Sequence, residues 1–212
     1  MEHSGKNPPV EPIRIDTGRF DVPLDWRKVF GRSGAVEIEV GTGKGRFLLD
    51  RAAKNPDRCF VGLEYARAYL NTLALRAVKR GLKNIRVTRC EAGLFFGELV
   101  PDCSVSAFHL LYPDPWPKKR HHKRRLIQRA FLADLRRVLV PGAILNIATD
   151  HPDYFEWMLD HFREWKGTFV IETKILSTPT ERKRFAGRTN YEIKYLAEGR
   201  TLHLLYGRRT GF

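Results

Sequence analysis

From Ala35 onward, the chain alternates short apolar segments with amphipathic ones, and this alternation limits the fold more than any other feature. Segments with the length and composition of strands occur at 36–40, 59–63, 84–90, 104–111, 143–148, 168–175 and 201–206. Helical spacing occurs at 46–54, 67–80, 123–140 and 151–165. The pattern predicts an α/β fold, with a mostly parallel, doubly wound sheet of seven strands and helices on both faces.

Two of the predicted helices have clear ends. In the segment 67–80, the apolar positions Leu70, Leu73, Ala74 and Ala77 fall on one face, and Gly81 follows as a cap. The segment 123–140 is expected to stop at 141–142, where the sequence is Pro-Gly, because proline does not continue a helix.

Residues 1–33 lack this periodicity and carry several prolines, so we expect a partly disordered N-terminal arm. Residues 34–212 would then form one domain. A chain of 212 residues is long enough for one sizeable α/β domain and short for two.

The composition is strongly basic. Lys and Arg number 38 against 24 Asp and Glu, which gives a formal net charge of +14. Cationic surfaces bind polyanions because neutralised phosphates release condensed counterions. A nucleic-acid partner is therefore expected, although ribosomal, DNA-binding and RNA-modifying proteins all share this composition.

Other observations disfavour further classes of protein. The chain has no run of about eighteen apolar residues, so no membrane-spanning helix is predicted, and its first residues lack the apolar core of a signal peptide. Cys59, Cys90 and Cys103 are isolated, which is typical of a reducing compartment, and no Cys/His spacing indicates a metal site. We expect a cytoplasmic protein with no metal and no membrane partner, either a monomer or a homodimer.

A glycine-rich segment, Glu39-Val40-Gly41-Thr42-Gly43-Lys44-Gly45, separates the first strand from the first helix. Glycines there let the backbone turn tightly and approach a ligand, so Gly41 and Gly43 are candidate nucleotide-binding residues. The segment fits neither the dinucleotide fingerprint nor the P-loop. Glu64 and Glu91 close the next two predicted strands, where acids can hold ribose hydroxyls and an adenine amino group.

The fourth predicted strand is followed by a rigid segment and then a cationic one. Asp114 lies between two prolines that restrict the backbone, so its carboxylate should be held still in an active site. Six of the eight residues at 118–125 are Lys or Arg. Such a run is often only a solvated helix face, but its place beside Asp114 favours a grip on RNA phosphates.

The segment 113–125, Pro-Asp-Pro-Trp-Pro-Lys-Lys-Arg-His-His-Lys-Arg-Arg, closely resembles the signature of the tRNA (guanine-N7-)-methyltransferases, which are class I S-adenosylmethionine-dependent enzymes with a Rossmann-like fold. The glycine segment, Gly62-Leu63-Glu64, Thr149-Asp150 and Thr189-Asn190-Tyr191-Glu192 are similar to the family too. The resemblance runs from about residue 35 to the C-terminus.

The resemblance implies a role for each matching position. S-adenosylmethionine would contact Glu39, Glu64, Glu91 and Asp114, although the family usually has Asp at position 91. The guanine site would be lined by Lys118, Asp150, Thr189, Asn190, Tyr191 and Glu192. RNA would meet Arg120, His121, His122, Lys123, Arg124 and Arg125. The products would be 7-methylguanosine in the tRNA variable loop and S-adenosylhomocysteine.

The residues fit this chemistry. Guanine N7 carries a free lone pair on the major-groove edge, so its methylation needs no general base. A carboxylate matches the N1–H and N2–H₂ donors of the other edge, and Asp114, Asp150 and Glu192 are candidates for that contact. We expect Asp114, the predicted catalytic residue, to position and recognise the base and not to act as a proton acceptor. Thr189 could complete the pocket with its hydroxyl or merely cap a loop.

Two alternatives stay open at this stage. Ribosomal RNA or a protein could replace tRNA as substrate, but amino-methylating enzymes typically carry a second proline where this chain has Trp116. The chain could also be a basic RNA-binding protein with a vestigial cofactor site, which the intact set of acids and glycines disfavours.

Overall fold

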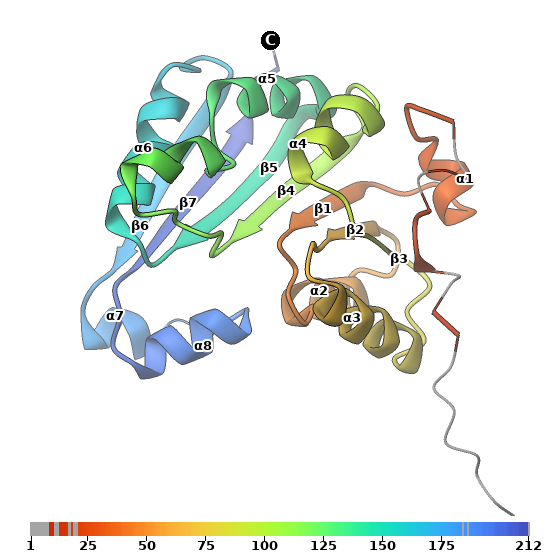
Figure 1. The fold of residues 1–212 in the computed structure, drawn as a ribbon, viewed down its shortest axis with the longest axis horizontal. Helices are drawn as coiled ribbons and strands as arrows, with labels where there is room; N and C mark the ends of the chain where they lie inside the picture. The colour runs from red at the N-terminus through yellow and green to blue at the C-terminus, as the bar shows by residue number, and fades with distance from the viewer. Residues whose placement is uncertain are drawn as a thin grey trace, which may run out of the picture.

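The computed structural model describes residues 9–10, 13–16, 18, 21–183, 185 and 187–211, and its centre is one seven-stranded sheet (Figure 1). The strands are β1 (Val36–Val40), β2 (Cys59–Leu63), β3 (Ile85–Thr88), β4 (Val105–Leu111), β5 (Leu139–Thr149), β6 (Phe169–Leu176) and β7 (Leu202–Arg209). Their order is β3-β2-β1-β4-β5-β7-β6. The pairs among β1 to β5 are parallel, whereas β7 is antiparallel to both of its neighbours. The predicted mostly parallel sheet is confirmed.

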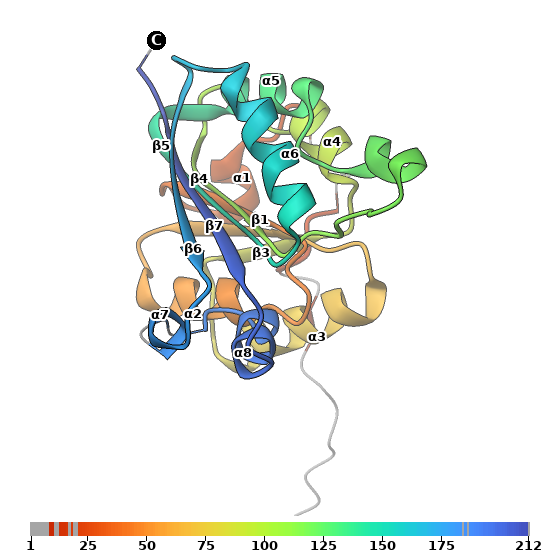
Figure 2. The ribbon, with the colours of Figure 1, turned by 90° about the vertical axis from the view of Figure 1, so that its left-hand side faces the viewer.

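Helices cover both faces of the sheet, as Figures 1 and 2 show. One face carries α1 (Trp26–Phe30), α4 (Ala92–Leu94) with the π-helical turn η3 (Phe95–Leu99), α5 (Arg129–Val138) and α6 (Pro152–Arg163). The other carries α2 (Arg46–Lys54), α3 (Arg67–Lys79) and α8 (Asn190–Ala197). The remaining helical segments are η4 (Lys119–Arg124) and α7 (Pro179–Lys183).

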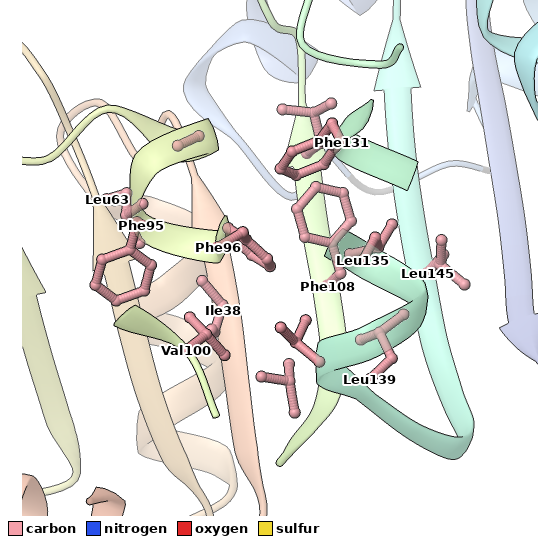
Figure 3. Close-up of a cluster of buried hydrophobic side chains, with 14 of the residues drawn as sticks. Ile38, Leu63, Phe95, Phe96, Val100, Phe108, Phe131, Leu135, Leu139 and Leu145 are labelled. Carbon is pink, nitrogen blue, oxygen red and sulfur yellow. The ribbon is translucent and has the colours of Figure 1, made fainter. Parts of the chain in front are cut away.

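Each face has its own apolar core. Between the sheet and the α4, η3 and α5 segments, the rings of Phe96, Phe108 and Phe131 lie 5.2–5.7 Å apart (Figure 3). On the other face, Leu73 and its neighbours on the predicted stripe of α3 are buried against α2 and the strands. Burying both faces of the parallel strands explains why their sequences are almost continuously apolar.

The helix predicted at 123–140 is shorter than expected, which corrects one prediction. Residues 119–124 form the 3₁₀ helix η4, and α5 begins only at Arg129. The reason lies at Arg125, whose side chain turns into the protein, while the Gln128 amide bonds to the carbonyls of Lys123 and Arg125. The helix ends at Val138, and the predicted Pro141–Gly142 stop lies inside β5, where the register against β4 is irregular.

Part of the predicted N-terminal arm packs against the domain. Leu24 and the α1 residues Val29 and Phe30 are buried in the core, and Arg14 forms a β-bridge with Val87 of β3. The first eight residues of the arm lie outside the described residues. The domain boundary at 33–34 stays a prediction.

Candidate active site

A cavity of about 480 Å³ lies at the carboxyl ends of β1, β2 and β4. The chain leaves β1 toward β2 on one side, while β4 lies on the other side. Doubly wound sheets bind ligands at such a switch point, because the connections diverge there and leave a crevice. The lining includes seven of the predicted site residues: Gly41, Gly43, Glu64, Glu91, Asp114, Arg124 and Tyr191.

A second, small cavity adjoins the first and shares Gly41, Gly43, Leu111 and Tyr191 with it. Three more predicted residues line it: Glu39, Thr189 and Asn190. The structure thus brings together residues that lie up to about 150 positions apart in the chain. Lys118, Asp150 and Glu192 line neither cavity.

The glycine loop forms one wall. Gly41 and Gly43 have φ of 75° and 53°, which is left-handed backbone that glycine adopts readily. A Cβ atom at either position would meet nothing within 4 Å among the described residues, so the surface beside the loop is open. Glu64 braces the loop, because its carboxylate accepts the N–H groups of Gly43 at 2.7 Å and Ala66 at 2.8 Å.

Glu39 is the most unusual group at the site. Its side chain is buried, and its Oε2 atom has no hydrogen-bond partner among the described residues. Burial and then the nearby charge of Glu64 raise the pKa of Glu39 to about 8. A buried carboxylate oxygen without a donor is costly. Together with the open glycine loop, it fits a ligand that brings hydrogen-bond donors and positive charge.

Glu91 lies at the rim, where it begins α4. Its carboxylate accepts the backbone N–H of Leu94 at 2.8 Å, and the residue is exposed. The chain thus uses Glu91 as a helix cap while its side chain still borders the cavity.

Asp114 lies on an arch of unusual backbone. Tyr112 and Trp116, two residues to either side, have φ of 57° and 45°. Bulky residues rarely adopt this region, and such conformations persist where the surrounding structure imposes them, often at functional sites. The two intervening prolines stiffen the arch further, so the Asp114 carboxylate is exposed on a rigid support.

The cationic segment after the arch divides into exposed and buried parts. Lys118, Lys119, Arg120, Lys123 and Arg124 are exposed. His121 and His122 are half-buried, with their rings against Trp116 and Trp157.

Arg125 departs from the prediction of a surface RNA contact. Its guanidinium is buried, pairs with Asp153, and donates from Nε to the Pro115 carbonyl at 2.9 Å. It also lies over the rings of Tyr154 and Trp157. We therefore correct its role: Arg125 anchors the arch from below because its charge finds partners inside the protein.

The predicted guanine-site carboxylates are held differently. Glu192 is fully buried, and its oxygens accept from the Arg188 backbone at 2.5 Å and from the Arg188 guanidinium at 2.7 Å. Asp150 pairs with Arg200 at 2.8 Å. Of the three candidates, only Asp114 lines the cavity described above. A contact between Glu192 and a base would first require Arg188 to release it.

Arg188 belongs to a buried polar chain that crosses the sheet. Its guanidinium donates to Asn146 Oδ1 at 2.9 Å, and Asn146 Nδ2 lies 3.4 Å from His109 Nδ1. His109 Nε2 lies 3.0 Å from Glu37 Oε2, and Arg51 completes the chain at 2.6 Å from the same oxygen. Burial lowers the pKa of His109, so the neutral ring donates to Glu37 and accepts from Asn146. The chain links β1, β4 and β5 to α8.

Thr189 caps α8. Its hydroxyl and the Glu192 backbone N–H are 2.9 Å apart, the contact of an N-cap residue. Of the two roles that the sequence left open for Thr189, the capping role is therefore present in the structure.

Comparison with known proteins decides the family. A family described as "Putative methyltransferase" matches residues 33–205. A tRNA (guanine-N(7)-)-methyltransferase of Alkalilimnicola ehrlichii is 36% identical over 193 residues, which are 88% of this chain and 78% of that protein. One of Geobacter metallireducens is 32% identical over 201 residues, 94% of this chain and 93% of that protein. The chain belongs to the tRNA (guanine-N(7)-)-methyltransferase family.

Solved methyltransferases share the fold of this tRNA (guanine-N(7)-)-methyltransferase family member. The 16S rRNA methyltransferase KamB superposes with a TM-score of 0.65 at 20% identity, over 87% of this chain and 92% of its own. The 16S rRNA (adenine(1408)-N(1))-methyltransferase of Catenulisporales acidiphilia, solved with cosubstrate SAM, gives 0.58 at 20% identity, over 88% and 92%. At this identity the likeness shows the fold alone, and it confirms the predicted Rossmann-like class I methyltransferase architecture.

Among the described residues of this methyltransferase family member, no group of three or more His, Cys, Asp or Glu side chains is arranged to hold a metal ion. None of the helices there is long and apolar enough to cross a membrane.

Sequence reasoning missed one residue that lines the candidate site of this tRNA (guanine-N(7)-)-methyltransferase family member and one that holds a predicted site residue. Trp116 lines the cavity with the Arg124 guanidinium 4.8 Å from its ring, and its position beside Asp114 was a usable signal. Arg188 was not predicted as a site residue, since nothing in the local sequence shows that its guanidinium pairs with the buried Glu192 carboxylate.

Proposed function

We propose that this protein transfers the methyl group of S-adenosylmethionine to N7 of a guanine in the variable loop of tRNA. The products are 7-methylguanosine and S-adenosylhomocysteine. One observation carries the proposal: a single cavity brings the open glycine loop and strand-end acids together with rigid Asp114 and cationic Arg124. The names of the two family relatives support tRNA and guanine N7 as the target.

The cofactor would be held by Glu39, Gly41, Gly43, Glu64 and Glu91. The open backbone at the two glycines leaves room for close approach, and Glu39 has an acceptor atom waiting for a donor. When bound, S-adenosylmethionine supplies an electrophilic methyl group on a sulfonium. Binding a cation beside Glu39 would favour the ionised carboxylate, whose pKa is raised by burial and then by the charge of Glu64.

The residues on the other side of the cavity would hold the guanine. N7 has its lone pair ready, so no side chain needs to remove a proton. Alignment of reacting groups can supply roughly 7–11 kcal/mol of the barrier, and the rigid arch suits that task. Asp114 would accept from the N1–H and N2–H₂ donors, which adenine lacks.

The exposed cations at 118–124 would grip RNA phosphates near the cavity. Arg124 borders the cavity itself, so it would act closest to the target nucleotide. A tRNA substrate also supports the cytoplasmic location expected from the sequence.

Labelled S-adenosylmethionine and unmodified tRNA test this proposal, followed by digestion and identification of nucleosides by mass spectrometry. We expect 7-methylguanosine at one position, which sequencing of cleaved fragments assigns to the variable loop. Label in ribosomal RNA or protein but not in tRNA would show that tRNA is not the substrate. Binding of tRNA without any methyl transfer would show that the protein is not a methyltransferase.

A further inference from the structure

A larger cavity, of about 790 Å³, extends away from the site described above and shares these residues with its small cavity: Gly43, Lys44, Arg46, Asn190 and Tyr191. It is lined by residues of the glycine loop, α2, α3 and the start of α8, which lie together on one face of the sheet (Figures 1 and 2). The cationic segment at 118–125 includes none of its charged residues, and of these only Lys44 lies in a segment that resembles the family.

The lining is strongly cationic. It contains Lys44, Arg46, Arg76 and Arg80, which together define the α2–α3 groove, and all four are exposed. Among the described residues of the lining, Asp50 is the one acid, and it pairs with Arg80 at 2.9 Å. The groove therefore carries three more positive than negative charges, a surplus that an anionic ligand would neutralise.

The charges are partly held in place. The Arg76 guanidinium donates to the Lys44 carbonyl at 3.1 Å, and Lys44 Nζ lies 6.0 Å from the centre of the Tyr69 ring. These contacts use no acid, so the charges of Arg76 and Lys44 stay available to a ligand.

The groove adjoins the candidate active site. Both cavities are lined by Gly43, Tyr69 and Tyr191. The active-site cavity is also lined by Trp116 and Arg124, next to the first cationic segment. The active site therefore lies between two basic surfaces that come from different elements.

We propose that the α2–α3 groove binds the phosphate backbone of the substrate RNA, on the opposite side of the target nucleotide from the 118–124 segment. This inference rests on the proposed function. Exposed cations suit phosphates, which are contacted irrespective of base sequence. Among the described residues, Arg80 is the one groove cation that pairs with an acid. Tyr69 and Tyr191, 41% and 47% exposed, stand where the two cavities meet and offer ring faces to a neighbouring base.

A pair of double variants tests the groove. Arg76→Gln with Arg80→Gln removes two charges from it at residues that line neither cavity of the active site, whereas Lys54→Gln with Lys79→Gln removes two exposed charges from α2 and α3 outside the lining. For each protein, the dissociation constant of an unmodified tRNA transcript is measured over a range of salt concentrations, and S-adenosylhomocysteine binding is measured by calorimetry.

We expect the groove variant to bind tRNA about tenfold more weakly than the control, with the slope of log affinity against log salt reduced by about 1.4–1.8, which corresponds to two phosphate contacts. S-adenosylhomocysteine binding should be unchanged, which also shows that the variant is folded. Arg76→Lys with Arg80→Lys should restore most of the tRNA affinity, because the charge is kept.

Two results would overturn the groove assignment: tRNA affinity equal to that of the control pair, or loss of S-adenosylhomocysteine binding together with tRNA binding, which would assign the charges to the cofactor loop. Failure of the proposed function looks different. In that case the wild-type protein makes no 7-methylguanosine. The comparison of tRNA binding between the variants still tests whether the groove binds RNA.

Discussion

At the scale of single residues, identical side chains take different states at neighbouring strand ends. Glu64 is satisfied by two backbone N–H groups, whereas Glu39 is buried with one oxygen unpaired. The difference comes from position: Glu39 lies inside β1, and Glu64 follows β2 at the surface of the crevice. The site thus contains one side chain, Glu39, with an oxygen that a ligand can contact, and another, Glu64, that holds the glycine loop in place.

Glu39→Gln should stabilise the protein increasingly as pH rises. The pKa of Glu39 is about 8 in the folded protein and 4.5 ordinarily. Between these values the folded state holds the extra proton, so the wild-type free energy of unfolding falls as pH rises. The variant lacks this loss and should gain up to about 1.4 kcal/mol per pH unit over the wild type. Urea unfolding at pH 5 and pH 8 measures the gain, and an equal difference at both pH values would contradict it.

Asp114→Ala should lower kcat/KM for tRNA by roughly a hundredfold, equivalent to about 2.7 kcal/mol. The carboxylate is exposed and lies on a backbone held by its neighbours, so stability and tRNA binding should change little. Single-turnover methylation and a binding assay separate these effects. Asp114→Asn serves as a control that keeps the size of the side chain, and full activity in that variant would argue against a role for the charge.

At the scale of elements, the segment between β4 and α5 owes its shape to one buried cation. Arg125 joins the Pro115 carbonyl to Asp153 and packs on two rings of α6. The five exposed cations before it are therefore presented on η4 and its approach, and do not continue into α5. Neighbouring arginines therefore differ in role: Arg125 is buried and supports the fold, whereas Arg124 is exposed at the surface.

Arg125→Met should cost about 1–3 kcal/mol of unfolding free energy, because the Pro115 carbonyl loses its charged donor and the pair with exposed Asp153 is lost. Its neighbour offers a matched comparison. Arg124→Ala removes an exposed cation over the Trp116 ring and should cost less than about 1 kcal/mol, but it should weaken tRNA binding. Thermal unfolding and tRNA affinity of the two variants check this contrast, and equal losses of stability would contradict it.

At the scale of the whole molecule, the buried polar chain ties the two halves of the sheet to α8. Glu37 on β1 pairs with Arg51 at 2.6 Å and with Arg58 at 2.7 Å, and contacts His109 on β4. From there the chain continues through Asn146 to the Arg188–Glu192 pair. Residues at the start of α8 line the active-site cavities, so this series of buried polar contacts fixes their positions.

Glu37→Gln should lose about 3 kcal/mol of stability at neutral pH, since the partly buried guanidinium groups of Arg51 and Arg58 would lose their charged partner. Burial would raise the pKa of Glu37, but hydrogen bonds from His109 and Arg51 lower it to about 2. Its contribution is thus complete above pH 4.5, the ordinary value, and is lost as pH falls toward 2. The difference between wild type and variant should shrink across this range in urea unfolding, and a constant difference would contradict the assignment.

The sequence by itself was sufficient for the order of the seven strands, the bounds of α2 and the buried face of α3, but it did not predict the short helices α1, α4, α7 and α8. The predicted features depend on patterns within a few residues, because backbone periodicity and turn chemistry are local. The family signature lies in one continuous segment, so it too was visible in the chain.

Only the tertiary structure decided which charges are free. Arg125 resembles its neighbours in sequence, but its guanidinium is buried and pairs with Asp153, 28 positions later. In sequence, Glu192 resembles a carboxylate that binds a ligand, but in the structure it forms an ion pair with Arg188. The α2–α3 groove gathers cations that are up to 36 positions apart in the chain. The burial of a charge depends on what the fold packs against it, and no local pattern contains that information.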